Sequence, residues 1–195
     1  MEYAYIFDVD GVLIDTMEVH FQCYKQALHE VNVPIDKAQF FRQAGMTGRE
    51  QIRYFAGKAG LLIDVEQVYQ RKRQLFEVYP GNFTMIECNV GLLRVLRASG
   101  IPIALASGSS KRSWLGIVKK FGIPADAMVG AEDVQKGKPN PDLFLCAAER
   151  LGVPPSECIV IEDSDAGIEA AKAAGMKALR FYNNRLQSCS FIDNK

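Results

Sequence analysis

The pattern of apolar and polar positions predicts four short strands, each ending in small or polar residues, over residues 3–7, 101–106, 127–129 and 159–161. Segments with helical spacing follow the last three strands, over residues 114–121, 141–151 and 166–174. Strands and helices that alternate in units of about thirty residues are typical of right-handed crossovers between parallel strands. We therefore expect an α/β fold built on a doubly wound, Rossmann-like parallel sheet.

Residues 16–80 break this alternation, because helical spacing continues through the whole segment. Glycine and proline separate four expected helices, over residues 18–31, 37–43, 49–60 and 65–78. We interpret them as two antiparallel helix pairs that form a small α-helical cap, with the return to the sheet at Tyr79-Pro80-Gly81-Asn82. The expected domains are a core of residues 1–15 and 81–195 and a cap of residues 16–80.

Carboxylates follow two of the expected strands. Asp8 and Asp10 come directly after the first strand, with Gly11 beside them, and Glu162 and Asp163 follow the fourth. Ligands of such sheets bind outside the carboxyl ends of the strands, so these side chains should face one crevice. Neighbouring carboxylates repel each other unless a cation or a proton offsets them, and oxygen ligands suit a hard divalent ion such as Mg2+. The simpler alternative is a turn after the first strand and a helix cap after the fourth.

Two further segments offer groups that bind anions. Ser107 follows the second strand and precedes Gly108-Ser109-Ser110, whose backbone amides would lie at a helix N-terminus. Lys138 stands in Gly137-Lys138-Pro139-Asn140-Pro141, where two prolines restrict the backbone. An exposed lysine usually only improves solubility, but a fixed ammonium can neutralise a phosphoryl group or a carboxylate cluster. We expect this second role for Lys138.

Composition narrows the class of protein. The chain has 195 residues, 48% of them hydrophobic, and its 23 basic residues balance its 23 acidic residues. A general binder of nucleic acid or of anionic membranes would need a basic excess, and no apolar stretch approaches the roughly 20 residues of a membrane span. The N-terminus lacks the features of a signal peptide. Five scattered cysteines are typical of reduced packing residues, so we expect a cytoplasmic protein. We also expect a monomer whose partner is a small molecule.

In combination, the four segments resemble the motifs of the haloacid dehalogenase superfamily. The first motif matches Asp8-Val9-Asp10-Gly11, the second Ser107, the third Lys138 and the fourth Glu162-Asp163-Ser164-x-x-Gly167. Their order, strand context and spacing agree across residues 5–170. The helical insert after the first motif is similar to the cap of the β-phosphoglucomutase-like branch, which contains phosphatases and phosphohexomutases. A dehalogenase of this superfamily lacks the second aspartate of the first motif, so Asp10 favours phosphoryl transfer.

The resemblance implies a catalytic role for four core residues. Asp8 would be the nucleophile that forms an aspartyl-phosphate, and Asp10 would be the general acid and afterwards the general base. Ser107 and Lys138 would hold phosphoryl oxygens as charge develops in the transition state.

The resemblance also implies a magnesium site. Mg2+ would be held by Asp8, the backbone carbonyl of Asp10 and Asp163, with Glu162 as a further ligand. Two glycines, Gly11 and Gly108, would lie against the bound substrate.

Substrate choice would depend on the cap. His20 and Arg49 look like the cap histidine and arginine that face the active site and the distal phosphate in β-phosphoglucomutase-like proteins. Arg49 lies in the glycine-flanked stretch Gly45-Met46-Thr47-Gly48-Arg49-Glu50. Lys111, on the helix after Ser107, is also placed to reach a second anion. The simpler interpretation makes His20 an ordinary residue of an amphipathic helix and Arg49 an exposed charge at a helix start.

The C-terminal segment departs from the family pattern. Only about twenty residues follow Gly175, where related chains usually carry another strand and helix. The stretch after Phe181 shows no clear periodicity, and we expect a loop or a frayed edge there. Either the edge of the sheet is trimmed or the chain is shortened.

Our leading hypothesis is a magnesium-dependent phosphatase that acts on a small phosphorylated metabolite such as a sugar phosphate. The closest alternative is a phosphohexomutase, in which a second hydroxyl of the sugar, and not water, attacks the aspartyl-phosphate. The four motifs do not separate the two reactions: His20 and Arg49 favour the mutase, and the simpler demand of hydrolysis favours the phosphatase. A non-catalytic binding module would be expected to lack at least one charged motif residue, and all of them are present.

Overall fold

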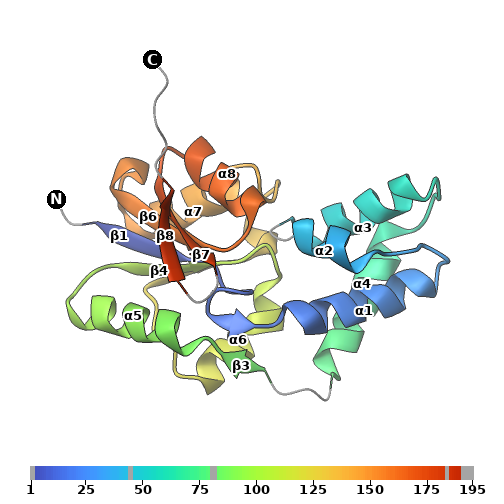
Figure 1. Cartoon of the computed structure of the whole chain (residues 1–195), viewed down its shortest axis with the longest axis horizontal. Helices are drawn as coiled ribbons and strands as arrows, with labels where there is room; N and C mark the ends of the chain where they lie inside the picture. The colour runs from blue at the N-terminus through green and yellow to red at the C-terminus, as the bar shows by residue number, and fades with distance from the viewer. Residues whose placement is uncertain (1–2, 44–45, 80–82, 183–184, 190–195) are drawn as a thin grey trace.

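A six-stranded sheet with helices on both faces forms one part of the molecule, and four helices form a second part beside it (Figure 1). The structure is a computed structural model that describes residues 3–43, 46–79, 83–182 and 185–189. The strand order is β5-β4-β1-β6-β7-β8, and neighbouring strands are parallel except for β7 and β8. The expected α/β fold, a doubly wound parallel sheet with an inserted helical segment, is confirmed.

The strands of the sheet are short and end at a common edge. They are β1 (Ala4–Phe7), β4 (Ile103–Ala106), β5 (Ala127–Val129), β6 (Cys158–Glu162), β7 (Lys177–Tyr182) and β8 (Arg185–Cys189). Phe7 of β1 is in register with Leu105 of β4 and with Ile161 of β6. The residues that follow these three strands therefore meet at the carboxyl edge of the sheet.

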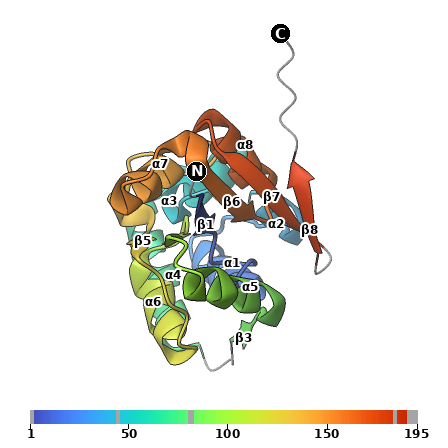
Figure 2. The same cartoon turned by 90° about the vertical axis from the view of Figure 1, so that its left-hand side faces the viewer.

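Side chains of the central strands alternate between two hydrophobic layers. Ile6 of β1 packs in the layer with α7 (Asp142–Leu151) and α8 (Asp165–Ala173). Phe7 packs in the opposite layer, with α5 (Glu87–Ala98) and α6 (Lys111–Lys120). Figure 2 shows the two pairs of helices on opposite faces of the sheet. Strands that are buried on both faces read as continuous apolar runs, which is why the pattern of the sequence predicted them.

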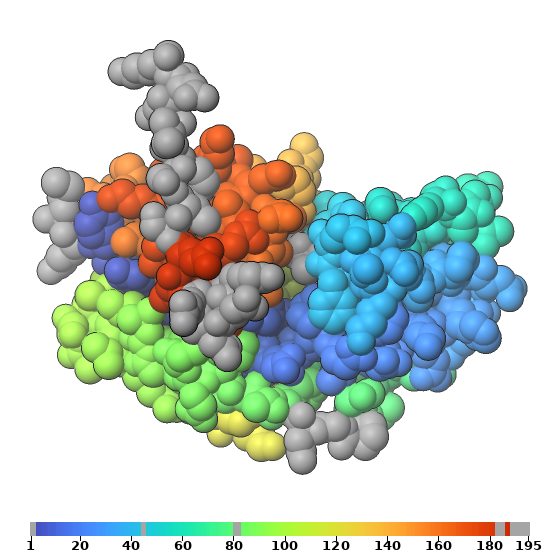
Figure 3. All heavy atoms as spheres, in the orientation of Figure 1, coloured from blue at the N-terminus to red at the C-terminus, as the bar shows by residue number. Residues whose placement is uncertain are grey.

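The second part contains α1 (Met17–His29), α2 (Lys37–Arg42), α3 (Gly48–Lys58) and α4 (Val65–Glu77). These helices share a hydrophobic core of their own, which includes Leu28, Phe40 and Phe55. Figure 3 shows their atoms, coloured from blue through cyan to blue-green, directly beside those of the core. We call these four helices the cap. The assignment of residues 16–80 to a separate domain stays a proposal, and the expected return turn at 80–82 lies outside the described residues.

Side chains explain where three cap helices begin. Asp36 and Asp64 each accept a hydrogen bond from the backbone amide three residues ahead, which satisfies a free N–H group of the first helical turn. Thr47 and Glu50 form a reciprocal capping box at the start of α3. These local signals are why the expected and observed helix starts agree closely.

A short antiparallel pair joins the two parts. It consists of β2 (Ile14–Asp15) and β3 (Thr84–Met85), and the sequence pattern did not predict it. Two-residue strands are too short to show a hydrophobic period. Their pairing also depends on distant segments that only the fold brings together.

The C-terminal segment is ordered where the structure describes it, so the expectation of a loop or frayed edge after Phe181 was wrong. Residues 185–189 form β8, which pairs with β7 in antiparallel register. Leu186 and Gln187 are both exposed. Backbone pairing with β7 holds this edge strand.

Two expectations from composition can be compared with the described residues. None of the described helices is both long enough and apolar enough to cross a bilayer. The cysteines whose side chains are described are free thiols, namely Cys23, Cys88, Cys146 and Cys158.

Candidate active site

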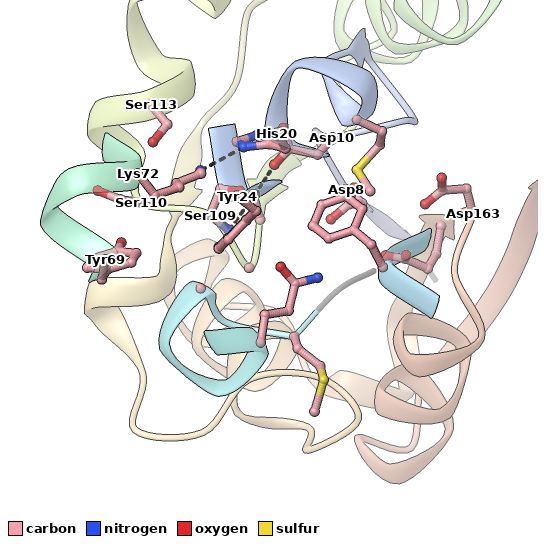
Figure 4. Close-up of a pocket in the computed structure, with 18 residues that line it drawn as sticks. Asp8, Asp10, His20, Tyr24, Tyr69, Lys72, Ser109, Ser110, Ser113 and Asp163 are labelled. Atoms are coloured by element: carbon pink, nitrogen blue, oxygen red, sulfur yellow. Dashed lines mark hydrogen bonds and ion pairs between the residues drawn. The ribbon is translucent and has the colours of Figure 1, made fainter. Parts of the chain in front are cut away.

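A cavity between the carboxyl edge of the sheet and the cap contains most of the motif residues (Figure 4). The core contributes Asp8, Asp10, Ser107, Gly108 and the following serines, together with Glu162 and Asp163. The cap contributes Met17, His20, Tyr24, Phe40, Met46, Gly48, Gln51, Tyr69 and Lys72. The polar strand ends do meet at one site, as the sheet topology predicted.

Lys138 lies beneath the cavity and joins two of its carboxylates. Its Nζ atom is 2.5 Å from Oδ1 of Asp8 and 2.7 Å from Oε2 of Glu162. All three side chains are buried. Although burial disfavours the charged ammonium, the two carboxylates raise the pKa of Lys138 above its ordinary value. Lys138 is therefore a fixed cation, as the two flanking prolines suggested.

The carboxylates around Lys138 exceed its charge. Oxygen atoms of Asp8, Glu162 and Asp163 lie within 4.8 Å of one another. Burial and then Glu162 raise the pKa of Asp8, with Lys138 opposing, and burial and then Glu162 raise the pKa of Asp163 to about 8. Three carboxylates against one ammonium leave an excess of negative charge, which adds to the effect of burial on both pKa values.

This cluster fits a hard divalent cation. Oxygen donors and excess negative charge are what Mg2+ requires, and such an ion would reverse the pKa shifts of Asp8 and Asp163. The two oxygens of Glu162 already have partners, because Oε2 accepts from Lys138 and Oε1 accepts from the amide and hydroxyl of Ser164. Asp8 and Asp163 are therefore better placed than Glu162 to bind a metal directly.

Gly11 brings the backbone close to this cluster. Its φ angle is +87°, which strains any residue with a side chain, and an added Cβ atom would collide with the carboxylate of Asp163. The glycine of the first motif is thus required by the approach of Asp163. A contact between Gly11 and substrate stays a prediction.

Asp10 faces away from the acidic cluster and has different partners. Its Oδ2 accepts a hydrogen bond of 2.7 Å from Ser107, and its Oδ1 accepts from Thr16 and lies 3.1 Å from Nε2 of His20. Burial alone would raise the pKa of Asp10, but His20 and then the two hydroxyls together lower it below its ordinary value. The two aspartates of the first motif therefore occupy opposite electrostatic environments. A role for the Asp10 carbonyl in metal binding stays a prediction.

His20 connects Asp10 to a buried lysine of the cap. Nζ of Lys72 donates to Nδ1 of His20 over 2.7 Å, so the ring proton resides on Nε2, which donates to Asp10. The His20 ring stacks on Phe76 with centroids 4.5 Å apart. Burial and then Lys72 lower the pKa of His20, which keeps the imidazole neutral. His20 is thus a buried partner of Asp10 and not an ordinary helix residue.

Sequence reasoning missed Thr16 and Lys72. Thr16 lies just before α1, where nothing in the local pattern distinguishes it from a helix cap. Lys72 carried a signal that could have been found: it falls on the buried face of α4 together with Val68 and Phe76, four residues from each. A lysine within an apolar helical stripe requires a buried partner.

Ser107 connects Asp10 to the following turn. Its hydroxyl donates to Asp10 and accepts a 2.9 Å hydrogen bond from the amide of Ser109. Gly108 lines the cavity beside it. The expected hydroxyl and backbone groups are therefore present at the start of α6, next to Asp10.

The start of α3 docks onto the loop that carries Lys138. The amide of Gly137 lies 3.4 Å from Oε1 of Glu50, and a Cβ atom at Gly137 would lie 2.6 Å from Cγ2 of Thr47. The capping box that begins α3 thus also joins cap and core. Only a residue without a side chain allows this approach at position 137.

Arg49 and Lys111, the two cations expected to bind a second anion, do not line the cavity. Arg49 makes two hydrogen bonds to Glu66, of 2.7 and 3.0 Å. The ammonium of Lys111 lies 2.9 Å from the carboxylate of Asp133. The structure thus unites Asp8, Asp10, Ser107, Lys138, Glu162 and Asp163 with His20, and leaves Arg49 and Lys111 in ion pairs outside the cavity.

Comparisons with known proteins identify the family to which the chain is similar. Residues 4–175 match the family model of haloacid dehalogenase-like hydrolases. The chain is 35% identical to β-phosphoglucomutase of Bacillus subtilis, over 90% of this chain and 81% of that protein. It is 30% identical to a phosphorylated carbohydrates phosphatase of Thermotoga maritima, over 90% and 83%. A crystal structure of β-phosphoglucomutase from Clostridium difficile superposes with a TM-score of 0.80 at 26% identity, covering 94% of this chain and 86% of that one.

The family match covers most of the chain, and the two curated relatives align over more than four-fifths of their length. The chain therefore belongs to the haloacid dehalogenase-like hydrolases, within the group that contains phosphatases and β-phosphoglucomutases.

Proposed function

We propose that this protein is a magnesium-dependent phosphatase that hydrolyses a small sugar phosphate through an aspartyl-phosphate on Asp8. The observation that carries the proposal is the contrast between Asp8 and Asp10 within one cavity. Asp8 shares the acidic cluster and Lys138, whereas Asp10 is surrounded by hydrogen-bond donors that favour its ionised form. The curated relatives that act on phosphorylated carbohydrates support the choice of substrate. We also propose that the enzyme works as a cytoplasmic monomer.

The first half-reaction would transfer the phosphoryl group to the enzyme. An oxygen of Asp8 attacks phosphorus, the bond from phosphorus to the sugar oxygen breaks, and the sugar oxygen takes a proton from the acid form of Asp10, which the attack of water in the preceding cycle produces. Lys138 orients Asp8 and offsets charge beside it, since its ammonium touches the attacking carboxylate. Asp8 and Asp163 would hold Mg2+, which would neutralise charge on the phosphoryl oxygens.

The second half-reaction would return the enzyme to its starting state. Water gives a proton to the ionised Asp10 and attacks phosphorus, and the bond from phosphorus to Asp8 breaks to release phosphate. Thr16, Ser107 and His20 all contact Asp10 and stabilise the ionised form that this step requires. Lys72 would act through His20, whose donating tautomer it selects.

Phosphohexomutase activity is the second candidate, because the chain resembles named β-phosphoglucomutases at up to 35% identity among the proteins compared. The two reactions share Asp8 and Asp10 and differ only in the acceptor of the phosphoryl group. Nothing at the acidic cluster separates water from a sugar hydroxyl.

A screen of phosphorylated sugars with Mg2+ tests the proposal, following both free phosphate and isomerised sugar. We expect phosphate release from hexose monophosphates. Conversion of a hexose 1-phosphate to its 6-phosphate, with only a trace of bisphosphate, would overturn the phosphatase in favour of the mutase.

The nucleophile is tested by Asp8→Asn, which should lower turnover by more than about a thousandfold. The matched control is Asp15→Asn, because Asp15 is exposed and belongs to the short strand β2. Wild-type turnover in Asp8→Asn would show that the nucleophile is another residue.

A further inference from the structure

The turn that carries Asp163 connects β6 to α8, and its last residue is fixed from within. The hydroxyl of Ser164 donates to Glu162 over 2.6 Å and accepts a 3.0 Å hydrogen bond from the amide of Gly167. The carbonyl of Asp163 comes one residue before this helix cap. The amide of Gly167, which a further helical turn would direct to that carbonyl, is therefore already used. The Asp163 carbonyl takes its partner from another element.

That partner is Arg180 of β7, the strand that lies next to β6 in the sheet (Figure 2). Its Nη1 atom donates to the backbone carbonyl of Asp163 over 3.1 Å. The register of the two parallel strands places Arg180 opposite Glu162, the residue just before Asp163. The contact therefore depends on how two strands pair, and the local sequence around Arg180 contains no sign of it.

Asp165 directs the guanidinium of Arg180 away from the carboxylate of Asp163. Nη2 of Arg180 donates to Oδ1 of Asp165 over 2.7 Å. A guanidinium beside an acidic cluster forms its strongest hydrogen bonds with a carboxylate, and Asp165 supplies one outside the cluster. Because the described hydrogen bonds of Arg180 go to the Asp163 carbonyl and to Asp165, the carboxylate of Asp163 stays available to a cation.

This arrangement suits a metal ligand that lies on a turn. Mg2+ requires near-ideal ligand geometry, and the position of the Asp163 carboxylate depends on the backbone that bears it. Gly11 allows the close approach of that carboxylate, and Arg180 holds the backbone behind it. The pair of Arg180 and Asp165 carries no net charge, so its effect on a nearby cation is mainly geometric.

We propose that Arg180 is a positioning residue for the metal site: it sets the affinity for Mg2+ by holding the backbone of Asp163, and Asp165 keeps its guanidinium from competing with the ion. Arg180 is not among the described residues that line the cavity, so it acts through Asp163. The inference rests on the proposed function, because that function makes Asp163 a ligand of Mg2+. It also gives β7, the strand that follows Gly175, a role in the site.

The test measures the dissociation constant of Mg2+ by calorimetry, on the protein without substrate. Arg180→Met should raise this constant about tenfold, because the outer partner of a metal ligand is lost. Charge alone predicts the opposite direction, since removing a positive charge should strengthen the binding of a cation. An unchanged or lower dissociation constant in Arg180→Met would therefore overturn the inference.

Lys177→Met is the matched control, because it removes the same charge from the same strand. Lys177 lies at the other end of β7, where its ammonium donates to the hydroxyl of Tyr3. Its loss should leave the dissociation constant of Mg2+ unchanged within about twofold, since exposed charges at a distance are screened. A rise as large as that in Arg180→Met would overturn the specific role of Arg180.

Asp165→Asn tests the second part of the inference. Without the Asp165 carboxylate, the guanidinium of Arg180 can turn to the carboxylate of Asp163, so the dissociation constant of Mg2+ should rise several-fold. The same change made in Arg180→Met should have no further effect, because Asp165 acts through Arg180. An equal rise in both backgrounds would show that Asp165 acts independently, at the start of α8, and would overturn this part.

Two further readouts separate positioning from general damage and from the proposed function. Raising Mg2+ well above its dissociation constant should restore phosphate release by Arg180→Met, which a general loss of structure would not allow. In hydrogen–deuterium exchange of the metal-free protein, the amides of residues 163–167 should exchange faster in Arg180→Met and not in Lys177→Met. If wild type binds no Mg2+, the proposed function fails, and the exchange still decides whether Arg180 holds the turn. Unchanged exchange would overturn the inference whatever the turnover.

Discussion

The two ends of the cavity differ in charge and in how they are held. At the core end, Asp8, Asp163 and Lys138 follow strands or a proline-framed loop, and the charges of Asp8 and Lys138 contact each other directly. At the cap end, Tyr24 and Tyr69 come from helices α1 and α4, and the described lining residues of the cap include Lys72 but no carboxylate. The core end thus has the rigid charges that phosphoryl transfer requires, whereas the cap end has side chains suited to recognising hydroxyls.

The largest effect is expected at the core end, from Lys138→Ala. Removing one partner of a buried ion pair leaves Asp8 and Glu162 uncompensated and should lower the free energy of unfolding by about 3–5 kcal/mol. Loss of the fixed cation should also reduce turnover by about a hundredfold to a thousandfold. Urea unfolding and phosphate release measure the two effects. Lys136→Ala, at an exposed position of the same loop, is the control. A fully active and stable Lys138→Ala would show that the core end of the cavity does not depend on a fixed cation.

A pH-dependent effect is expected at the junction of the two ends, from Lys72→Met. Burial lowers the pKa of Lys72 from 10.5 to about 8. Below about pH 8 the lysine is charged in the folded and in the unfolded state, and burying that charge destabilises the folded state. Between about pH 8 and 10.5 the folded state loses the proton first, so the free energy of unfolding should rise with pH by roughly 3 kcal/mol.

Lys72→Met should abolish this rise and increase stability at neutral pH, while turnover falls because His20 loses its donor. Urea unfolding at pH 7 and pH 10 measures the slope. Lys58→Met, at an exposed position of α3, should keep the wild-type slope. An unchanged slope in Lys72→Met would mean that another group titrates.

A smaller effect is expected where cap and core touch, from Gly137→Ala. The new Cβ atom would lie 2.6 Å from Cγ2 and 2.8 Å from the amide nitrogen of Thr47, so the cap must move away. We expect KM to rise about tenfold with little change in the urea midpoint, because the positioning of substrate is lost and both hydrophobic cores persist. Gly57→Ala in α3, where an added Cβ atom meets nothing within 4 Å, should not raise KM. Wild-type KM in Gly137→Ala would show that this contact does not position the cap.

The smallest effect is expected within the cap, from Asp36→Ala. Loss of the side-chain cap of α2 should lower the free energy of unfolding by about 1 kcal/mol. Phe40 of the same helix stays packed on Phe21 and Tyr24, so the cavity wall should persist and kcat/KM should not change. A large loss of activity, measured by phosphate release, would show that the cap end depends on the position of α2.

The core end could be predicted from the sequence because its residues follow apolar strands. A buried parallel strand is recognisable as a continuous apolar run, and the residue after it must lie at the carboxyl edge of the sheet. Asp8, Ser107 and Asp163 were therefore assigned to one crevice without knowledge of any contact. Lys138 followed from its proline frame.

The cap end could be predicted only in part. The helices were recognisable from their caps and periodicity, but the partners of Arg49 and Lys72 were not. Arg49 meets Glu66 across 17 residues of sequence, and Lys72 meets His20 across 52. Such pairs depend on how helices pack, and the period of one helix contains no information about the register of the next.

By itself, the sequence determined the sheet, the helical insert and the residues at the strand ends, because each depends on a local pattern and on one rule of sheet topology. The kind of chemistry followed from the resemblance of its motifs to a known family. Only the tertiary structure decided which charges are neutralised. It placed Lys138 between Asp8 and Glu162, His20 between Lys72 and Asp10, and Arg49 against Glu66. A side chain's charge can be read from the sequence, but its electrostatic effect depends on partners and burial, which exist only in the folded chain.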